Sequence, residues 1–262
     1  MADADSLLRD GDVASARAAL VDIVRSRPAD EQARMFLFQL LALNGEWDKA
    51  VTQLQSLVQL APDAQMLGVT YNQAIAAERQ RAAIFAGEGE MELLTGKGGW
   101  AEGVARAISL QARGDLAGAE AAREEAFDNA PDTPGTLDGV DFDWIADADG
   151  RFGPTFEAIV GGRYGLIPFD TVAAIKSEGP QDLRDTIWYP VEIAFSSGQS
   201  AAAFIPARYP GSEASGDDAV KLARVTQWLD RGQGEEGAGQ RLWMLSDGNE
   251  RGLLDMRLIE FR

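Results

Sequence analysis

The stretch "GEWDKAVTQLQSLVQLAPD", residues 45–63, begins with a glycine, continues as a helix-like run and ends near a proline. Two other stretches share this layout, "GDVASARAALVDIVRSRPAD" from Gly11 and "GDLAGAEAAREEAFDNAPD" from Gly114. The glycine and the proline are equally far apart in each copy: 11 to 28, 45 to 62 and 114 to 131. Glycine tolerates a positive φ in a tight turn and proline cannot continue a helix. The pattern therefore predicts three helices with matching ends.

The middle copy shows the character of these helices most clearly. Its apolar residues recur at i, i+3, i+4 and i+7 spacing, which places them on one helical face: Trp47, Ala50, Val51, Leu54, Leu57 and Val58. A small residue also follows each glycine by five positions, at Ala16, Ala50 and Ala119, where it lets a preceding helix approach closely. Each copy is predicted to be the amphipathic second helix of a helix pair.

The distances between the copies indicate a repeat protein. Gly11 and Gly45 are 34 residues apart, the period of tetratricopeptide (TPR) repeats, whereas Gly45 and Gly114 are 69 apart. The spacing resembles that family, although Phe38 stands where its pattern has a glycine and Arg123 stands where the other copies have leucine. Such repeats bury their apolar faces only by stacking.

The remaining sequence separates into a helical and a β-rich part. A long helix is predicted over residues 66–87 and a turn-rich loop over 88–99, and after about residue 137 the chain consists of short β-branched and aromatic runs. "SSGQ" (196–199) and "SDGNE" (246–250) are typical of hairpin turns. The predicted fold is α+β: a TPR-like α-α superhelix over residues 1–131, then a β-rich domain over 132–262 forming a bent antiparallel sheet or partial barrel.

Composition narrows the classes of function. The net charge of the 262 residues is −18, which disfavours nucleic acid and anionic membranes as partners and favours a basic protein segment. Cysteine and histidine are absent, which excludes thiolate chemistry, disulfides and histidine-based catalysis. No secretion signal or membrane-spanning run is apparent, so a cytoplasmic protein is expected.

Three short motifs that might hold a ligand do not have the required residues. The acidic run of Asp141, Asp143, Asp147 and Asp149 fails as an EF-hand, because Ile145 and Phe156 would occupy ligand positions. "GK" at 96–97 lacks the upstream glycine and following Ser/Thr of a phosphate loop, and "GGRYG" (161–165) is better explained as a bend between strands. No cofactor and no metal site is predicted.

Two Arg-Tyr pairs offer candidate partner-binding residues. Arginine and tyrosine are enriched at interface hot spots, and the candidates, together with two nearby carboxylates, are Arg163, Tyr164, Arg208, Tyr209, Asp147 and Asp149. The alternative is internal bracing, with arginine paired to the acidic run and tyrosine packed on the sheet. Asp147, Asp149 and Arg163 are also the candidates for a carboxylate-based enzyme site, which would require them to converge in a pocket.

Several C-terminal stretches carry a more specific likeness. "IADADGRFGPTFEAIVGGRYGLIPF" (145–169), "DLRDTIWYPVEI" (182–193), "ARYPGSE" (207–213) and "LLDMRLIEF" (253–261) resemble, in this order, the ImpE family, also called SciE or TagJ, of type VI secretion accessory proteins. Gly161 and Gly165 replace bulkier residues of that pattern, which puts the local strand geometry in question.

The resemblance implies a cytoplasmic, non-enzymatic accessory of the contractile secretion apparatus. It also implies contact with the N-terminal helical segment of the small sheath subunit (TssB, or VipA) and an indirect link to the disassembly ATPase ClpV. No catalytic residues are implied. A stack of helix pairs leaves a long surface that can hold a partner helix, so docking on the helical layer or at its junction with the β domain is the leading hypothesis. A scaffold that forms a homo-oligomer through its β domain is the alternative.

Overall fold

A computed structural model describes residues 2–96, 99–232 and 234–262. The helices are α1 (Ala2–Arg9), α2 (Val13–Ser26), α3 (Glu31–Leu43), α4 (Trp47–Leu60), α5 (Gln65–Phe85), α6 (Ala101–Ala112), α7 (Leu116–Asp128) and the short α8 (Asp218–Lys221). Strands occupy the chain after residue 134, so the predicted α+β fold, helical first and antiparallel sheet second, is confirmed.

The repeated glycines act as predicted. Gly11, Gly45 and Gly114 have φ of +86°, +67° and +83°, directly before the turns that lead into α2, α4 and α7. In two of the copies an aspartate follows the glycine and caps the helix: Asp12 and Asp115 accept hydrogen bonds from backbone N–H groups three residues later. Local residues alone therefore determine where these helices begin.

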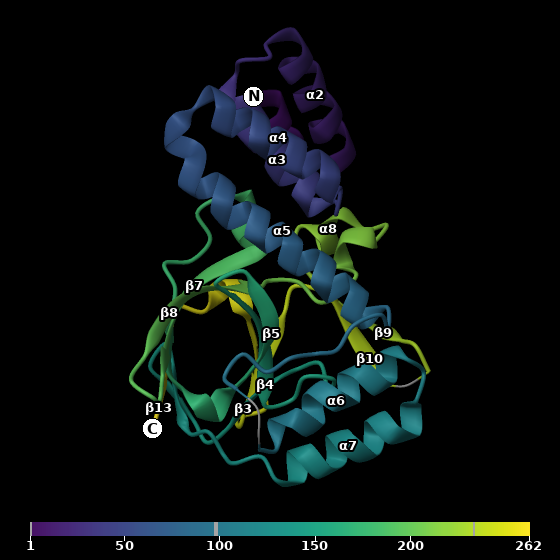
Figure 1. The fold of residues 1–262 in the computed structure, drawn as a ribbon, viewed down its shortest axis with the longest axis vertical. Helices are drawn as coiled ribbons and strands as arrows, with labels where there is room; N and C mark the ends of the chain where they lie inside the picture. The colour runs from purple at the N-terminus through teal and green to yellow at the C-terminus, as the bar shows by residue number, and fades with distance from the viewer. Residues whose placement is uncertain (1, 97–98, 233) are drawn as a thin grey trace.

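The third copy does not stack on the first two, which corrects the expectation of one continuous pile of repeats. Helices α1 to α4 pack in sequence, and α5 then crosses the molecule to the pair formed by α6 and α7, at the opposite end from α2 (Figure 1). Arg123 of α7 occupies the position of the buried Leu20 and Leu54 and donates a hydrogen bond to Gln111 of α6. A polar contact therefore replaces the apolar face that a next repeat would bury.

The strands of the described residues form three sheets. Their bounds are β1 Gly135–Leu137, β2 Val140–Phe142, β3 Ile145–Asp147, β4 Thr155–Val160, β5 Arg163–Pro168, β6 Val172–Lys176, β7 Trp188–Phe195, β8 Ser200–Pro206, β9 Thr226–Asp230, β10 Glu235–Gly239, β11 Leu242–Leu245, β12 Glu250–Gly252 and β13 Leu258–Phe261. The main sheet has the order β2-β1-β13-β6-β7-β8-β4-β5 with antiparallel pairs throughout, and β9–β10 and β12–β11–β3 form the others. The predicted turns at 196–199, 246–250 and 161–162 join β7–β8, β11–β12 and β4–β5.

The main sheet is bent but does not close into a barrel, and part of the loop after α5 covers its β5 edge. Leu94 donates its backbone N–H to Leu166 (2.9 Å), and Leu166 donates to Glu92 (2.8 Å). A Cβ on Gly165 would lie 2.6 Å from the carbonyl oxygen of Glu92, so glycine is required for this close approach. Lys97 and Gly98, part of the phosphate-loop-like motif, lie outside the described residues.

Two hydrophobic cores hold the molecule together. One joins the helices to the sheet: the Tyr71 ring of α5 lies 5.5 Å from Trp188 of β7 and 5.6 Å from Phe204 of β8, between ring centroids. The other fills the bend of the sheet, where the Trp243 ring lies 5.6 Å from Phe156 and 5.1 Å from Phe169. Because the first core is continuous across helices and strands, α5 is seated firmly on the sheet.

Candidate partner-binding cleft

The segment between β8 and β9 attaches the β domain to the ends of the N-terminal helices. Buried Arg208 donates 2.9 Å to the carbonyl oxygen of Leu43, at the C-terminus of α3. Arg224 donates to the carbonyl oxygens of Leu8 (2.8 Å) and Arg9 (3.0 Å), at the C-terminus of α1. The last carbonyls of a helix lack partners within the helix and attract cations. Both arginines therefore cap helices across the junction.

A buried ion network lies directly beneath this junction. Arg81 of α5 donates two hydrogen bonds to Glu157 of β4, at 2.7 and 3.0 Å. Arg241 bridges Glu157 to Asp147, and the Tyr164 hydroxyl also donates to Glu157. Burial alone would raise the pKa of Glu157, but the two arginines lower it to about 2. Burial raises the pKa of Asp147 to about 6 against the opposing effect of Arg241.

A second ion cluster continues the network toward the β9–β10 hairpin. Arg151 contacts Asp149 at 2.6 Å and Glu236 at 2.9 Å, and its guanidinium lies 5.6 Å from the centre of the Phe85 ring. Gly237 donates its backbone N–H to Asp149 (2.9 Å). These contacts fix the hairpin beside the C-terminal end of α5.

The structure places five of the six predicted partner-binding residues inside the protein. Their side chains are buried: Tyr164, Arg208, Tyr209, Asp147 and Asp149. Burial agrees with the bracing alternative, but neither arginine pairs with the acidic run, because Arg208 donates to backbone carbonyls and Arg163 pairs with Glu92. Arg163 is exposed at the start of β5 and pairs with Glu92 at 3.2 Å.

The residues suggested for an enzyme site do not converge. Asp147 is paired with Arg241 and Asp149 with Arg151 inside the protein, whereas Arg163 pairs with a different carboxylate outside it. Within the described ranges, no group of three or more acidic side chains is arranged to hold a metal ion.

Above the ion network, two adjoining pockets follow one side of α5, and we call them together the junction cleft. The pocket beside α4, of about 250 Å³, is lined by Trp47, Glu78, Arg81, Ala82, Phe85, Ala86, Pro210, Gly211 and Glu213. The pocket beside α6, of about 330 Å³, is lined by Phe85, Ile108, Gln111, Ala112, Arg151, Pro210, Gly211, Arg231 and Glu236. Phe85, Pro210 and Gly211 border both pockets.

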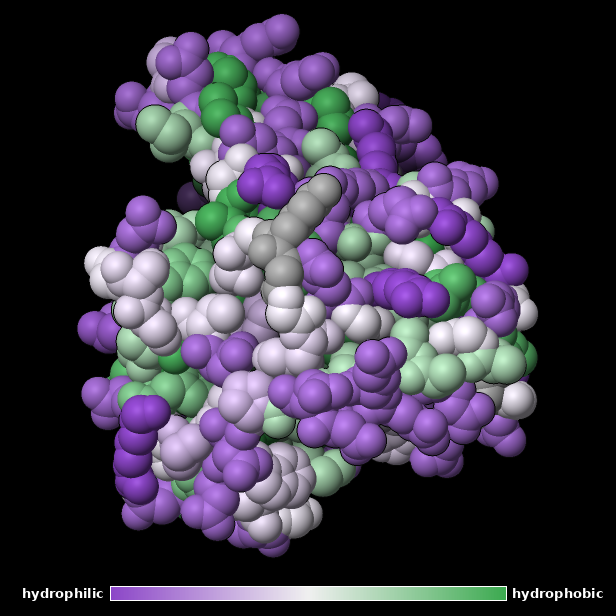
Figure 2. Space-filling view, turned by 60° about the horizontal axis from the view of Figure 1, so that its bottom comes forward, coloured by the Kyte–Doolittle hydropathy of each residue, from purple (hydrophilic) through white to green (hydrophobic). Residues whose placement is uncertain are grey.

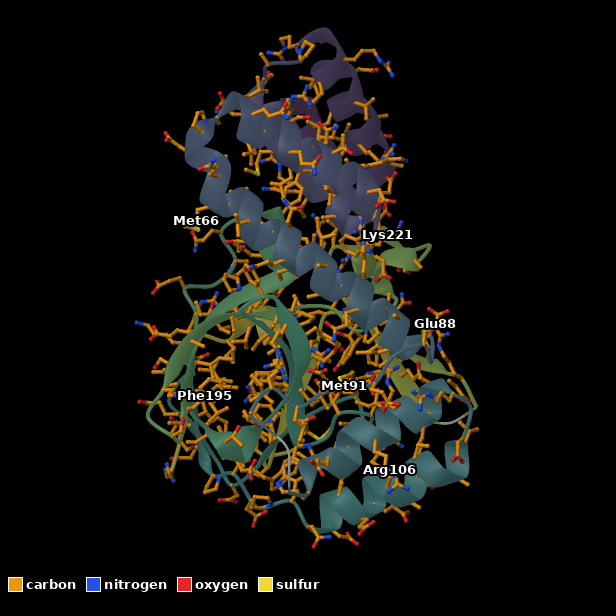
Figure 3. The ribbon with its side chains drawn as sticks, viewed as in Figure 1. Met66, Glu88, Met91, Arg106, Phe195 and Lys221 are labelled. Carbon is orange, nitrogen blue, oxygen red and sulfur yellow. The ribbon has the colours of Figure 1, made fainter. Side chains whose placement is uncertain are left out.

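The side chains of the cleft come from both halves of the molecule. In Figure 3, Met66 and Glu88 mark the two ends of the region that contains α5, and Lys221 marks α8 beside it. One wall is helical and the other is the segment after β8 together with the β9–β10 hairpin. Aromatic rings and charged groups both line it, which suits an amphipathic peptide segment.

Sequence reasoning did not identify the residues of this cleft, although one signal was present. From Ala64 to Ala77 the chain carries no charged residue, and Glu78 and Arg81 then appear three positions apart. On a helix this spacing puts both on one face. Charged residues that return at this spacing, after a long uncharged stretch of helix, indicate a buried polar contact.

A layer of TPR-like helix pairs joined to a bent antiparallel sheet, with a cleft along the joint, defines this chain as a two-part helical-repeat protein. A family model described as tetratricopeptide repeat matches residues 7–70, and one described as ImpE protein matches residues 139–260. The chain is 42% identical over 258 residues to the type VI secretion system accessory component TagJ of Pseudomonas aeruginosa, covering 98% of this chain and 90% of that protein. The chain belongs to the ImpE family, and is thus a type VI secretion accessory protein.

A solved structure has the same fold. The crystal structure of protein VPA1032 from Vibrio parahaemolyticus superposes with a TM-score of 0.88 at 19% identity, covering 99% of this chain and 97% of that chain. The helical layer, the long crossing helix and the bent sheet are therefore shared at low sequence identity. Among the described residues, none of the helices has the length and apolar character needed to cross a membrane.

Proposed function

We propose that this accessory protein acts in the cytoplasm by holding the N-terminal helical segment of the small sheath subunit (TssB, or VipA) in the junction cleft. The choice of this partner rests on what the family resemblance implies. The observation that favours the cleft is the composition of its pocket beside α4, in which the rings of Trp47 and Phe85 lie with Glu78 and Glu213 on a chain of net charge −18. A basic amphipathic helix complements both features, because its apolar face meets the rings and its cations meet the acidic field.

The proposal describes a binding protein and not an enzyme. The carboxylates that catalysis would have used, Asp147 and Asp149, form ion pairs inside the protein and keep β3 and the following turn in place. A link to ClpV would then be indirect, through the sheath.

Isothermal titration calorimetry with a synthetic peptide of the sheath subunit's N-terminus tests this function. We expect a dissociation constant of tens of micromolar or tighter, and no heat from a scrambled peptide of the same composition. Ala82 lines the cleft, and Ala76 is exposed on α5 outside it, so Ala82→Arg should abolish binding and Ala76→Arg should leave it unchanged. No binding of the native peptide, or equal binding by both variants, contradicts the proposal.

Self-association is a second candidate, favoured by a different surface. The turn between α4 and α5 exposes Leu60, Met66 (76% exposed) and Val69, and Asp63 is the single charged residue between Lys49 and Glu78. Figure 2 shows one face of the molecule as a mosaic of separate hydrophobic groups among hydrophilic residues. Two copies of so acidic a chain would meet most easily at an uncharged surface. Light scattering tests this, since a dimer should dissociate on Met66→Lys.

A further inference from the structure

The pocket beside α4 gathers two carboxylates and an aromatic ring around one hollow. Glu78 comes from α5 and is buried, Glu213 comes from the segment after β8 and is half-buried, and Trp47 begins α4. The Trp47 ring lies 6.1 Å from the Trp188 ring, which fixes it against the sheet. The pocket thus has a rigid aromatic wall and two acidic groups.

The negative charge of this pocket is incompletely compensated. Glu78 accepts a hydrogen bond from the Trp188 indole at 3.1 Å and has a long contact of 3.4 Å with Arg81, whose shorter bonds go to Glu157. For Glu213, no described residue donates a hydrogen bond or forms an ion pair with its carboxylate. Burial first, and then the charge of Glu213, raise the pKa of Glu78 against the opposing effects of Arg81 and Arg208. Arg208 also attracts Glu213, but its hydrogen bonds go to the backbone carbonyls of Leu43 and Lys221. A buried carboxylate thus faces a second carboxylate that has no cation in direct contact with it.

Glu213 is held in position by its surroundings. Its Cγ would lie 2.8 Å from a Cβ on Gly45, so the repeat glycine leaves the space that the Glu213 side chain occupies. The backbone beside it is fixed by Ser212, which donates to the carbonyl oxygen of Tyr209 (2.6 Å) and accepts from the N–H of Gly239 (2.8 Å). The Glu213 carboxylate therefore lies on a short segment whose backbone is held by hydrogen bonds.

We propose that this pocket receives the cationic side chain, lysine or arginine, of the segment bound in the junction cleft. Its identity as a sheath-subunit side chain rests on the proposed function. The cation would pair with Glu213 and Glu78 and lie against the Trp47 ring, while its aliphatic part would pack on Ala82 and Phe85. At about 250 Å³ the pocket has room for one such side chain. The inserted charge then sets the register of the docked helix.

Binding of the native N-terminal peptide to two matched variants tests the pocket. Glu213→Gln removes the carboxylate without a partner, and Glu124→Gln makes the same change at an exposed position of α7. We expect Glu213→Gln to weaken binding about ten-fold, as loss of a charge-assisted contact does, with no measurable change for Glu124→Gln. Peptide lysines and arginines should then be replaced by glutamine one at a time. We expect one of these replacements to weaken binding to the wild-type protein but to have no further effect on binding to Glu213→Gln.

A second measurement does not depend on the sheath subunit. We expect n-butylammonium or methylguanidinium chloride to shift the NMR signal of the Trp47 indole N–H, assigned with Trp47→Phe, more than sodium chloride of equal ionic strength does. The shift should be lost in Glu213→Gln. If the peptide binds equally to both glutamine variants, the pocket proposal is overturned while the proposed function stands. If the peptide does not bind at all, the proposed function fails. In that case the absence of the indole shift overturns the proposal that the pocket binds a cation.

Discussion

Replacing Arg81 by methionine should destabilise the protein strongly, because this side chain connects the helical layer to the sheet through a buried charge. Glu157 has no exposed side-chain surface, and Arg81 provides two of its hydrogen bonds. Without Arg81, Glu157 retains Arg241 and Tyr164, and Glu78 loses its nearest cation. Removing one partner of a buried ion pair typically costs about 3–5 kcal/mol of unfolding free energy.

Urea unfolding followed by tryptophan fluorescence and circular dichroism measures this cost. Arg79→Met is the matched control, because Arg79 lies on the same helix and pairs with an exposed Asp48, so we expect a loss of about 0–1 kcal/mol. Adding Glu157→Gln to Arg81→Met should recover part of the loss, since one of the two buried carboxylates that lost Arg81 is then uncharged. A loss from Arg81→Met below about 1 kcal/mol, equal to that of the control, would refute the role assigned to the buried network.

Three further outcomes are expected. Gly45→Ala and Gly114→Ala both place a side chain at positive φ and should each lower the free energy of unfolding by about 1–2 kcal/mol. Only Gly45→Ala should also weaken peptide binding, because its Cβ would meet Glu213, whereas nothing lies within 4 Å of a Cβ at Gly114. Equal effects of the two variants on binding would contradict the contact between Gly45 and Glu213. Arg81 and Arg241 hold the pKa of Glu157 at about 2, below its usual 4.5. The ionised Glu157 therefore stabilises the protein above pH 4.5, and this stabilisation is lost as pH falls through 2. The difference in unfolding free energy between wild type and Glu157→Gln should narrow over that range, and a constant difference would argue against this role of Glu157. Raising sodium chloride from about 0.05 to 0.5 M should slow association of the basic peptide in stopped-flow measurements, and a salt-independent association rate would remove the electrostatic argument.

Features that depend on neighbouring residues were predictable from the sequence. The glycines and aspartates that open α2 and α7 act through their own backbone and through N–H groups three residues away, so local patterns suffice. The hairpin turns after β7 and β11 are equally local. Asp182 and Asp185 form a capping box before β7, which also involves only neighbouring residues.

Features that depend on distant partners were not predictable in the same way. Arg163 and Tyr164 are neighbours on β5, and successive strand residues point to opposite faces, so one side chain is exposed and the other reaches Glu157. Arg208 appeared to be a surface residue because its acceptor, the end of α3, lies far away in the sequence. Similarly, the position of α6 and α7 depends on where α5 ends in the fold, and the repeat spacing does not specify that point.

Site-specific photo-cross-linking tests the central claim most directly, that the junction cleft holds the sheath subunit's N-terminal segment. p-Benzoylphenylalanine in place of Ala86, which lines the cleft, should form an adduct with the full-length small sheath subunit on irradiation, mapping to its N-terminal segment. The same group in place of Gln55, on the outer surface of α4, should form none. An adduct from position 55 without one from position 86 would contradict docking in the cleft.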